Sequence, residues 1–401
     1  MSGLITRKRG KTWEYSFEIA KVDGKRKRVT KSGFRTKSEA VAAGTKAKAE
    51  YDSTGTVFNA STVSVADYMA YWLENYVRNH LAYESYRTYE SVSRKHIVPK
   101  LGAYRLSALA PDAIQRWVDG LKAEGYPRGS ISVFLAVLSG AISYAVYPCK
   151  FVAQNPCTHV RLPKIPATSE QKARTEFVCS KEDWERIEST FCGTDYYLPL
   201  EICYHTGMRV GECFGLDLLR DIDFKNHTLS INRQLRKVDG VWKYVNPKYD
   251  SIRTILIGPT LERIIRAEMT ARKKDMLRYA EYYKKTYVGP EQVLIQLPAD
   301  QEPPEGMREV WPIVRENGTI MNTAASDHMS ILIRKKLGLD MFHMHCLRHT
   351  HGTILAENGA SPKTIMERLG HKSIQVTMER YVTNTERMQE QAVSLFERAI
   401  K

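Results

Sequence analysis

The chain has 401 residues, 43% of them hydrophobic, and a formal net charge of +15 with a sequence pI near 9.3. This length exceeds one ordinary domain, and we find neither a ~20-residue apolar run that could span a membrane nor an apolar stretch that would make the basic N-terminus a secretory signal. The seven cysteines include no Cys-x-x-Cys pair, which argues against a disulfide framework or a thiolate zinc site and predicts a reducing, cytoplasmic location.

The positive charge is concentrated near the N-terminus. Residues 1–50 hold 14 Lys or Arg and 5 Asp or Glu, a net charge of +9. Because more than half of the total charge lies in an eighth of the chain, the distribution favours a nucleic-acid partner over a merely solvated basic surface.

Residues 1–58 predict a small domain of strand, turn, strand and helix. Alternation along 11–20 places four apolar side chains on one side of a strand: Trp13, Tyr15, Phe17 and Ile19. A turn at Asp23-Gly24 leads into a second strand that ends near Phe34, and an Ala-rich helix with Ser38 as its cap follows. The two strands form a ribbon that could enter a DNA major groove. The cations expected to contact DNA there are Lys25, Arg26, Lys27 and Arg28.

Residues 62–163 predict an all-helical domain. Apolar residues at helical spacing give helices over 65–77, 84–98, 110–125 and 130–146, with Pro111 tolerated at the start of the third. Arg87, Arg94 and Lys95 are the candidate DNA contacts on these helices. The Pro-containing, polar and basic stretch 164–175 predicts a linker.

Residues 176–401 predict a mixed helical and strand domain. Helices are expected over 180–191 and 197–216, then a strand pair over 228–238 and 241–248 around Asp239-Gly240, and a further strand over 253–257. A long charged helix over 261–283 leads to a second hairpin candidate at Asn317-Gly318, and residues 327–401 are expected to be helical.

The stretch HMHCLRHTHGT, residues 343–353, contains four of the eleven histidines. On a helix, His345 and His349 have the i, i+4 spacing of zinc ligands. A zincin helix also needs a glutamate directly after its first histidine, and Cys346 occupies that place. We therefore expect no metal here, and a purely structural helix stays an alternative interpretation of this stretch alone.

Two other stretches contain residues suited to phosphate chemistry. In TGMRVGE, Arg209 lies near a helix start and Glu212 could hold its guanidinium. Further on, a helix capped by Ser361 with Pro362 in its first turn ends at Gly370, directly before His371. Ser373 caps the next helix, which carries Tyr381.

Taken in order, these residues resemble the catalytic set of a tyrosine recombinase of the phage integrase family. The matching residues are Arg209, Lys248, His345, Arg348, His371 and Tyr381. The whole chain resembles integrases of phages and of conjugative transposons from Gram-positive bacteria. That resemblance implies a multidomain, mostly α protein with a β-sheet-plus-helix arm-binding domain (1–58), a helical, SAM-like core-binding domain (62–163) and a mixed α+β catalytic domain with a C-terminal tail (176–401).

The reaction that the resemblance implies is attack of Tyr381 on a DNA phosphodiester, which gives a 3′-phosphotyrosine and a free 5′-hydroxyl. The covalent intermediate conserves the bond energy, so no cofactor is expected, and two arginines take the place of metal ions. Arg209 and Arg348 would fork onto the phosphate while His371 donates a further hydrogen bond.

His345 would accept the tyrosine proton, and Lys248 would protonate the leaving oxygen. The lysine of the family lies on a β-hairpin and is often followed by Thr or Ser, whereas Tyr249 follows Lys248 here. Lys243 is therefore kept as the alternative general acid.

The expected partners are double-stranded DNA with core and arm sites, and a homotetramer formed through the C-terminal tail. An excision accessory factor is a further expected partner. The tail has an apolar stripe at helical spacing, formed by Met388, Ala392, Val393 and Phe396. A type IB topoisomerase, with a similar set of residues, and a non-catalytic DNA-binding regulator of the same fold remain the alternatives.

Overall fold

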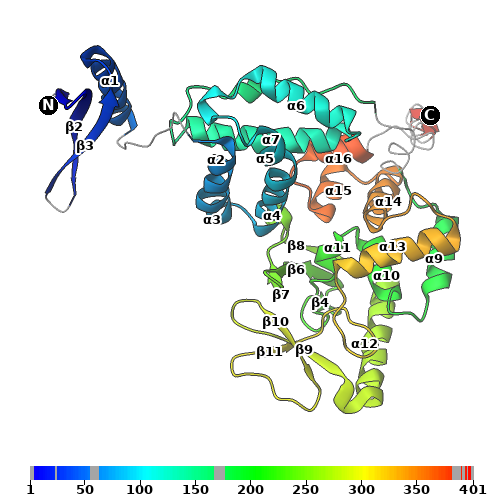
Figure 1. Ribbon diagram of the computed structural model, residues 1–401. Coiled ribbons are helices and arrows are strands. Elements are labelled where there is room, and N and C mark those ends of the chain that lie inside the picture. Colours follow the sequence, from blue (N-terminus) through cyan, green and yellow to red (C-terminus); the bar gives the residue numbers. More distant parts are fainter. Residues whose placement is uncertain are drawn as a thin grey trace. The chain divides into compact units, whose positions relative to one another are not determined.

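The computed structural model describes residues 4–22, 25–54, 63–166 and 177–381, together with residues 390, 393–394 and 396–398 (Figure 1). The chain divides into two compact units, Met1–Ala167 and Thr168–Lys401. The predicted turn at Asp23-Gly24, most of the predicted linker 164–175 and most of the tail lie outside the described residues.

The N-terminal sheet has three antiparallel strands in the order β1-β2-β3: β1 (Ile5–Arg9), β2 (Thr12–Val22) and β3 (Lys25–Phe34). The predicted alternation is confirmed for Tyr15 and Phe17, which are buried next to helix α1 (Lys37–Thr54). The prediction of two strands is wrong, because β1 is a third strand. It was missed because its sequence has no apolar alternation. Instead, Arg7 and Arg9 of β1 form ion pairs with the buried Glu14 of β2.

The start of α1 differs from the prediction by two residues. Thr36, not Ser38, caps the helix: its hydroxyl accepts from the backbone N–H of Glu39 at 3.1 Å. The Glu39 carboxylate in turn accepts from the N–H of Arg35 at 3.0 Å. This reciprocal pair is a variant of the capping box, which needs a hydroxyl residue three positions before a glutamate.

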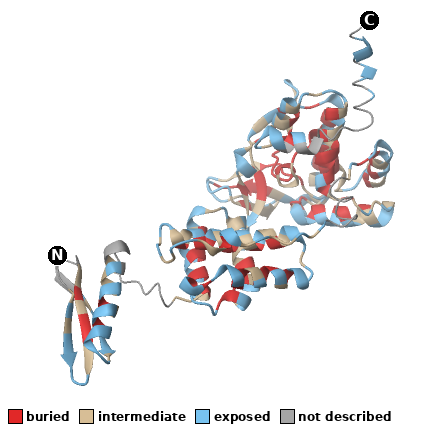
Figure 2. Cartoon of the chain, turned by 90° about the horizontal axis from the view of Figure 1, so that it is seen from above, coloured by how far each residue is buried: buried red, intermediate tan, exposed pale blue. Residues whose placement is uncertain are grey.

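The helical predictions for residues 63–166 are confirmed. The elements are α2 (Val65–Trp72), the π-helical segment η1 (Leu73–Val77), α3 (Arg78–His80), α4 (Tyr83–Val92), the π-helical segment η2 (Ser93–Ile97), α5 (Val98–Leu101), the 3-10 helix η3 (Leu106–Ala108), α6 (Pro111–Ala123), α7 (Arg128–Val146) and the 3-10 helix η4 (Pro156–His159). Pro111 is the first residue of α6, where its missing N–H removes no helical bond. The apolar faces meet in a core that includes Trp72, Ile97, Ile114, Ile131 and Leu138 (Figure 2).

Helix α7 corrects one statement about composition. The helix has 19 residues, and an 18-residue window within it has a mean hydropathy of 1.8, so it is long and apolar enough to cross a membrane by these measures alone. The helix nevertheless buries Ile131, Phe134, Leu138 and Ile142 within the core of its own domain. Its apolar composition is therefore explained by packing against the other helices.

The second unit begins with α9 (Lys181–Phe191), α10 (Tyr197–Thr206) and α11 (Val210–Cys213), and a sheet in the order β4-β5-β8 follows. Its strands are β4 (Ile222–Asp223), β5 (Thr228–Ile231) and β8 (Arg253–Leu256), and β6 (Gln234–Val238) pairs separately with β7 (Val241–Val245). The predicted single strand over 228–238 is therefore wrong. It divides at Asn232 and Arg233, where Arg233 binds both carboxylate oxygens of Asp221 at 2.8 and 3.0 Å.

The remaining elements complete this unit. They are the 3-10 turn η5 (Lys248–Asp250), α12 (Pro259–Tyr279), the 3-10 turn η6 (Ala280–Tyr282), a sheet of β9 (Lys284–Val288), β10 (Leu294–Pro298) and β11 (Arg308–Val310), and helices α13 (Thr323–Leu337), α14 (Met344–Glu357), α15 (Pro362–Leu369) and α16 (Ile374–Tyr381). The long charged helix and the C-terminal helices were predicted, whereas the β9–β11 sheet was not. At Asn317-Gly318 the turn forms, but its flanks make only a single bridge between Val314 and Ile320.

Candidate active site

Arg209 is held at the junction of α10 and α11. Helix α10 ends at Gly207, whose φ of 65° is the left-handed conformation that a helix-ending glycine adopts. Arg209 is then the N-cap residue of α11, and its Nη1 donates to the Oε1 of Glu212 at 2.7 Å. The prediction that Glu212 holds this guanidinium is confirmed.

Glu212 also binds a second arginine, which the sequence reading missed. Its side chain is 0% exposed, and the Nη2 of Arg253 on β8 donates to its Oε2 at 2.8 Å. Burial would raise the pKa of the Glu212 carboxyl, but the hydrogen bonds and charges of Arg253 and Arg209 outweigh burial and lower that pKa. The carboxylate is therefore ionised and shared by two guanidinium groups.

The same two arginines connect Glu212 to the end of α15. Nη2 of Arg209 donates to the carbonyl of Gly370 at 2.8 Å, and Nε of Arg253 donates to the carbonyl of Arg368 at 2.8 Å. Gly370 has a φ of 69°, which favours glycine, and a Cβ there would also lie 2.8 Å from Nη1 of Arg253. These contacts fix the backbone that leads into His371.

Arg348 lies on α14, which packs against α10. Its side chain is buried, and its Nη1 donates to the carbonyl of Gly207 at 2.9 Å. Arg348 therefore binds the turn at Gly207, which lies two residues before Arg209. His345, in the first turn of α14, is exposed and stands edge-on to the buried His349 with ring centroids 4.8 Å apart.

His371 contacts the helix that ends with Tyr381. Its Nδ1 lies 2.8 Å from the hydroxyl of the fully buried Thr377 in α16. Tyr381 is the last residue of α16, four positions after Thr377, and its side chain is outside what the structure describes.

His351 supports the site without facing it. Burial and the neighbouring Arg368 lower the pKa of His351 to about 4, so the ring is neutral at pH 7. Its Nδ1 lies 2.9 Å from the carbonyl of Tyr204 and its Nε2 accepts from Nε of Arg368 at 2.9 Å. This tautomer braces Arg368, whose carbonyl in turn receives Arg253.

The two candidate general acids occupy different places. Lys248 is exposed and begins η5, in the connection between β7 and β8, rather than lying on a strand of the β6–β7 hairpin. Ser251 of the same connection accepts from Nη1 of Arg209 at 3.1 Å, so this loop adjoins the arginine. Lys243 lies on β7, with its Nζ 3.7 Å from the carboxylate of Glu291.

The predicted DNA contacts divide into two groups. Arg87, Arg94 and Lys95 are exposed on α4 and η2, as a phosphate-binding role requires. Arg28 on β3 lies 3.3 Å from Glu18 in an exposed ion pair, and the side chains of Lys25, Arg26 and Lys27 fall outside the described residues.

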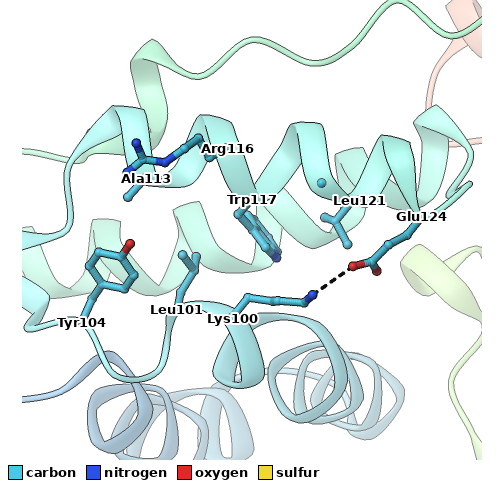
Figure 3. Close-up of a pocket in the computed structure, with 9 residues that line it drawn as sticks. Lys100, Leu101, Tyr104, Ala113, Arg116, Trp117, Leu121 and Glu124 are labelled. Atoms are coloured by element: carbon cyan, nitrogen blue, oxygen red, sulfur yellow. Dashed lines mark hydrogen bonds and ion pairs between the residues drawn. The ribbon is translucent and has the colours of Figure 1, made fainter.

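A cavity of about 240 Å³ lies between α5 and α6, far in the sequence from the candidate catalytic residues (Figure 3). Its cations are already paired: Lys100 Nζ is 3.0 Å from Glu124, and Arg116 is 2.8 Å from Asp112. Trp117 forms its wall and donates to the carbonyl of His96 at 3.0 Å. These pairings favour a structural groove over an anion site.

Comparison with known proteins decides the family. A sequence profile for the phage integrase family matches residues 180–388, just over half of the chain. The chain belongs to the phage integrase family. Profiles for the N-terminal SAM-like domain of phage integrases and for an arm DNA-binding domain match residues 64–122 and 5–51. The protein is thus a tyrosine recombinase, an enzyme of site-specific DNA recombination.

Individual relatives agree with this family. The XerC-like tyrosine recombinase of Caldanaerobacter subterraneus subsp. tengcongensis is 26% identical over 331 residues, covering 80% of this chain and 79% of the relative. The integrase of Staphylococcus phage L54a is 26% identical over 294 residues, covering 69% of this chain and 76% of the relative.

The fold is also found in solved structures. The Tn1549 transposon integrase in complex with transposon right end DNA superposes with a TM-score of 0.64 at 19% identity, covering 84% of this chain and 100% of that one. A lambda integrase tetramer bound to a Holliday junction gives a TM-score of 0.54 at 15% identity, covering 94% and 95%. The predicted fold class, mostly helical with small sheets, is confirmed.

The shared carboxylate gives a first prediction. Glu212→Gln keeps the shape of the side chain but leaves two guanidinium groups without their anion. Removing one partner of a buried ion pair costs about 3–5 kcal/mol, so thermal unfolding of the full chain should shift downward. Because Arg209 loses its support, single-turnover DNA cleavage below the unfolding temperature should slow by roughly 10²-fold.

The matched control is Glu367→Gln, which breaks an exposed pair with Lys363 on α15. That variant should keep wild-type stability and rate, since exposed ion pairs contribute little. A Glu212→Gln protein with unchanged cleavage would show that Arg209 does not depend on this carboxylate.

Proposed function

We propose that this recombinase integrates and excises a mobile element by cutting and rejoining DNA through a 3′-phosphotyrosine on Tyr381. One observation carries the proposal: Arg209 binds the carbonyl of Gly370, next to His371, and His371 contacts the helix that carries Tyr381. Tyr381 is the last residue of this helix, α16, four positions after Thr377.

In this mechanism the arginines stabilise the transferring phosphoryl group. Both arginines are held near the Gly207 turn: Glu212 binds Arg209, and the Gly207 carbonyl binds Arg348. Phosphoryl transfer depends mainly on positioning and on neutralising the non-bridging oxygens, and arginine stays charged throughout. His371 adds a hydrogen bond from the neighbouring turn, with no metal ion or other cofactor.

Two proton transfers complete the reaction. A free tyrosine has a pKa near ~10, so its proton needs an acceptor, and the exposed His345 fills this role. The leaving 5′-oxygen takes a proton from Lys248, whose loop contacts Arg209 through Ser251. We prefer Lys248 to Lys243 because the ammonium group of Lys243 faces Glu291 instead.

Replacing the nucleophile tests this function. Tyr381→Phe removes one hydroxyl, so the variant should bind core-site DNA like the wild type and form no covalent adduct on a nicked trapping substrate. Denaturing gel electrophoresis of the reaction measures the adduct. A wild-type level of adduct would place the nucleophile elsewhere.

Two further assays, relaxation of supercoiled DNA and joining of products from two sites, separate the alternative functions. A type IB topoisomerase-like enzyme would relax supercoiled DNA without exchanging products between sites. A non-catalytic regulator would bind DNA but form no adduct even with Tyr381 present. Recombinant products joined from two sites, in addition to the adduct, exclude both.

We also propose that the active form is a homotetramer on DNA assembled through the C-terminal tail. Val393 and Phe396 of the predicted apolar stripe are each 64% exposed, whereas Met388 and Ala392 lie outside the described residues. The lambda integrase structure is a tetramer on a Holliday junction, which supports the same assembly for this fold. We expect the enzyme to act in the cytoplasm. In excision we expect an accessory protein to act with it.

Deletion of residues 388–401 should therefore reduce synapsis and strand exchange more than DNA binding. Electrophoretic mobility shifts of single-site and paired-site complexes measure the two effects separately. The point variant Phe396→Ser should show the same imbalance more weakly, since it removes one apolar side chain of the stripe. A truncated protein that recombines at the wild-type rate would exclude the tail as the assembly element.

The N-terminal domain, we propose, binds arm sites that are separate from the cleaved core sites. The net charge of +9 on residues 1–50 and the three-stranded sheet support this role. Deleting residues 1–58 should spare adduct formation on a core site but impair integration, because linked modules gain affinity through effective concentration. Arm-site binding should weaken with salt at a slope of about −0.9 per phosphate neutralised. Loss of core-site adducts with the arm would instead show a role in catalysis or folding.

A further inference from the structure

Tyr249 has an unusual backbone conformation beside the candidate general acid. Its φ is 63° and its ψ 26°, and the next residue, Asp250, has a φ of 49°. Residues other than glycine rarely adopt this left-handed region, and a bulky one there is strained. Tyr249 is also 59% exposed, so burial of its ring does not explain the conformation.

Hydrogen bonds around the loop hold this strained backbone. Asp250 donates its N–H to the carbonyl of Pro247 at 3.0 Å and accepts on its carboxylate from Asn246 at 3.1 Å. Gln234 of β6 fixes the start of the loop by donating to the Asn246 carbonyl at 2.7 Å. The N–H of Ile252 donates to the Asp250 carbonyl at 2.7 Å, directly before β8. The loop is therefore built to keep Tyr249 in place.

The ring so placed meets two ammonium groups. Nζ of Lys248 lies 5.1 Å from the ring centroid, and Nζ of Lys372 lies 5.7 Å from it. Both distances are within the range of cation–π attraction. Lys372 follows His371 directly, so the ring joins the Lys248 loop to the turn that carries His371.

We propose that Tyr249 is a positioning residue that orients Lys248 for protonation of the leaving 5′-oxygen. The inference rests on the proposed role of Lys248. An exposed lysine side chain samples many rotamers, and a ring that holds its ammonium raises the fraction of time spent in the productive one. Through Lys372 the ring also keeps the loop in register with His371.

The chemical step defines a specific readout. As the bond between the Tyr381 hydroxyl oxygen and phosphorus forms, the bond to the 5′-oxygen breaks, and that oxygen takes a proton from the Lys248 ammonium. When sulfur replaces this oxygen, the phosphorus–sulfur bond breaks and a thiolate leaves without a proton. A defect that acts through Lys248 is therefore suppressed on the sulfur substrate, whereas a defect in folding or DNA binding is not.

The test compares single-turnover cleavage of a core-site duplex and of its 5′-bridging phosphorothiolate analogue by full-length variants. Tyr249→Phe keeps the ring and should cleave both like the wild type. Tyr249→Gly removes the ring while keeping the left-handed backbone accessible. It should slow cleavage of the ordinary duplex by roughly three- to thirtyfold, the range of cation–π contacts, and cleave the analogue at the wild-type rate. Tyr282→Gly, at an exposed tyrosine of η6, is the matched control and should cleave both normally.

Equal slowing of Tyr249→Gly on both substrates would overturn the inference, and so would a Tyr249→Phe variant as slow as Tyr249→Gly. Lys248→Ala and Lys243→Ala, run in parallel, keep the two hypotheses apart. Rescue of Lys248→Ala without rescue of Tyr249→Gly overturns the role of Tyr249 alone. Failure to rescue Lys248→Ala, or rescue of Lys243→Ala instead, overturns the role of Lys248 and the inference with it.

Discussion

The two ion pairs of the buried Glu212 carboxylate, with Arg209 and Arg253, are the contacts on which the rest of the candidate site depends. The carboxylate accepts hydrogen bonds from Arg209 and Arg253, two guanidinium groups that would otherwise repel each other. One negative charge neutralises one of the two positive charges, so the cluster keeps a surplus that suits a phosphate. Because the anion is fixed inside the protein, Arg209 is already oriented without DNA, as the phosphoryl transfer proposed above requires.

From Glu212 the contacts run outward to every segment that carries a candidate catalytic residue. Arg209 reaches Ser251 in the Lys248 loop and Gly370 beside His371, while Arg348 holds the Gly207 turn from α14. His351 adds a second layer by bracing Arg368, whose carbonyl binds Arg253. Hydrogen bonds thus link the segments of the candidate site, and a change at His351 would act through Arg368 and Arg253.

Apolar spacing and capping residues in the sequence predicted the helices, because helices form mainly through contacts between residues close in the chain. Helices with clear apolar spacing and caps, such as Ser361 before α15 and Pro111 at the start of α6, were predicted correctly. Strand β1 and the division of 228–238 were missed because no apolar pattern marks them; backbone pairing defines both, and ion pairs to Glu14 and Asp221 accompany them. Arg253 was missed for the same reason, since no local pattern says that a strand residue will meet Glu212. The set from Arg209 to Tyr381 was assigned by resemblance, because no spacing in the sequence relates residues so far apart in the chain, and it stays a prediction.

The histidines of 343–353 show how environment separates residues of one type. His343 is the N-cap residue of α14, His345 is exposed in its first turn, and His349 is buried against it. His351, one helical turn after Arg348, is kept neutral by burial and by Arg368. A neutral ring can donate through one nitrogen and accept through the other, and both contacts of His351 need this form. Environment therefore separates the exposed His345, the proposed proton acceptor, from the buried His351, whose two contacts require a neutral ring.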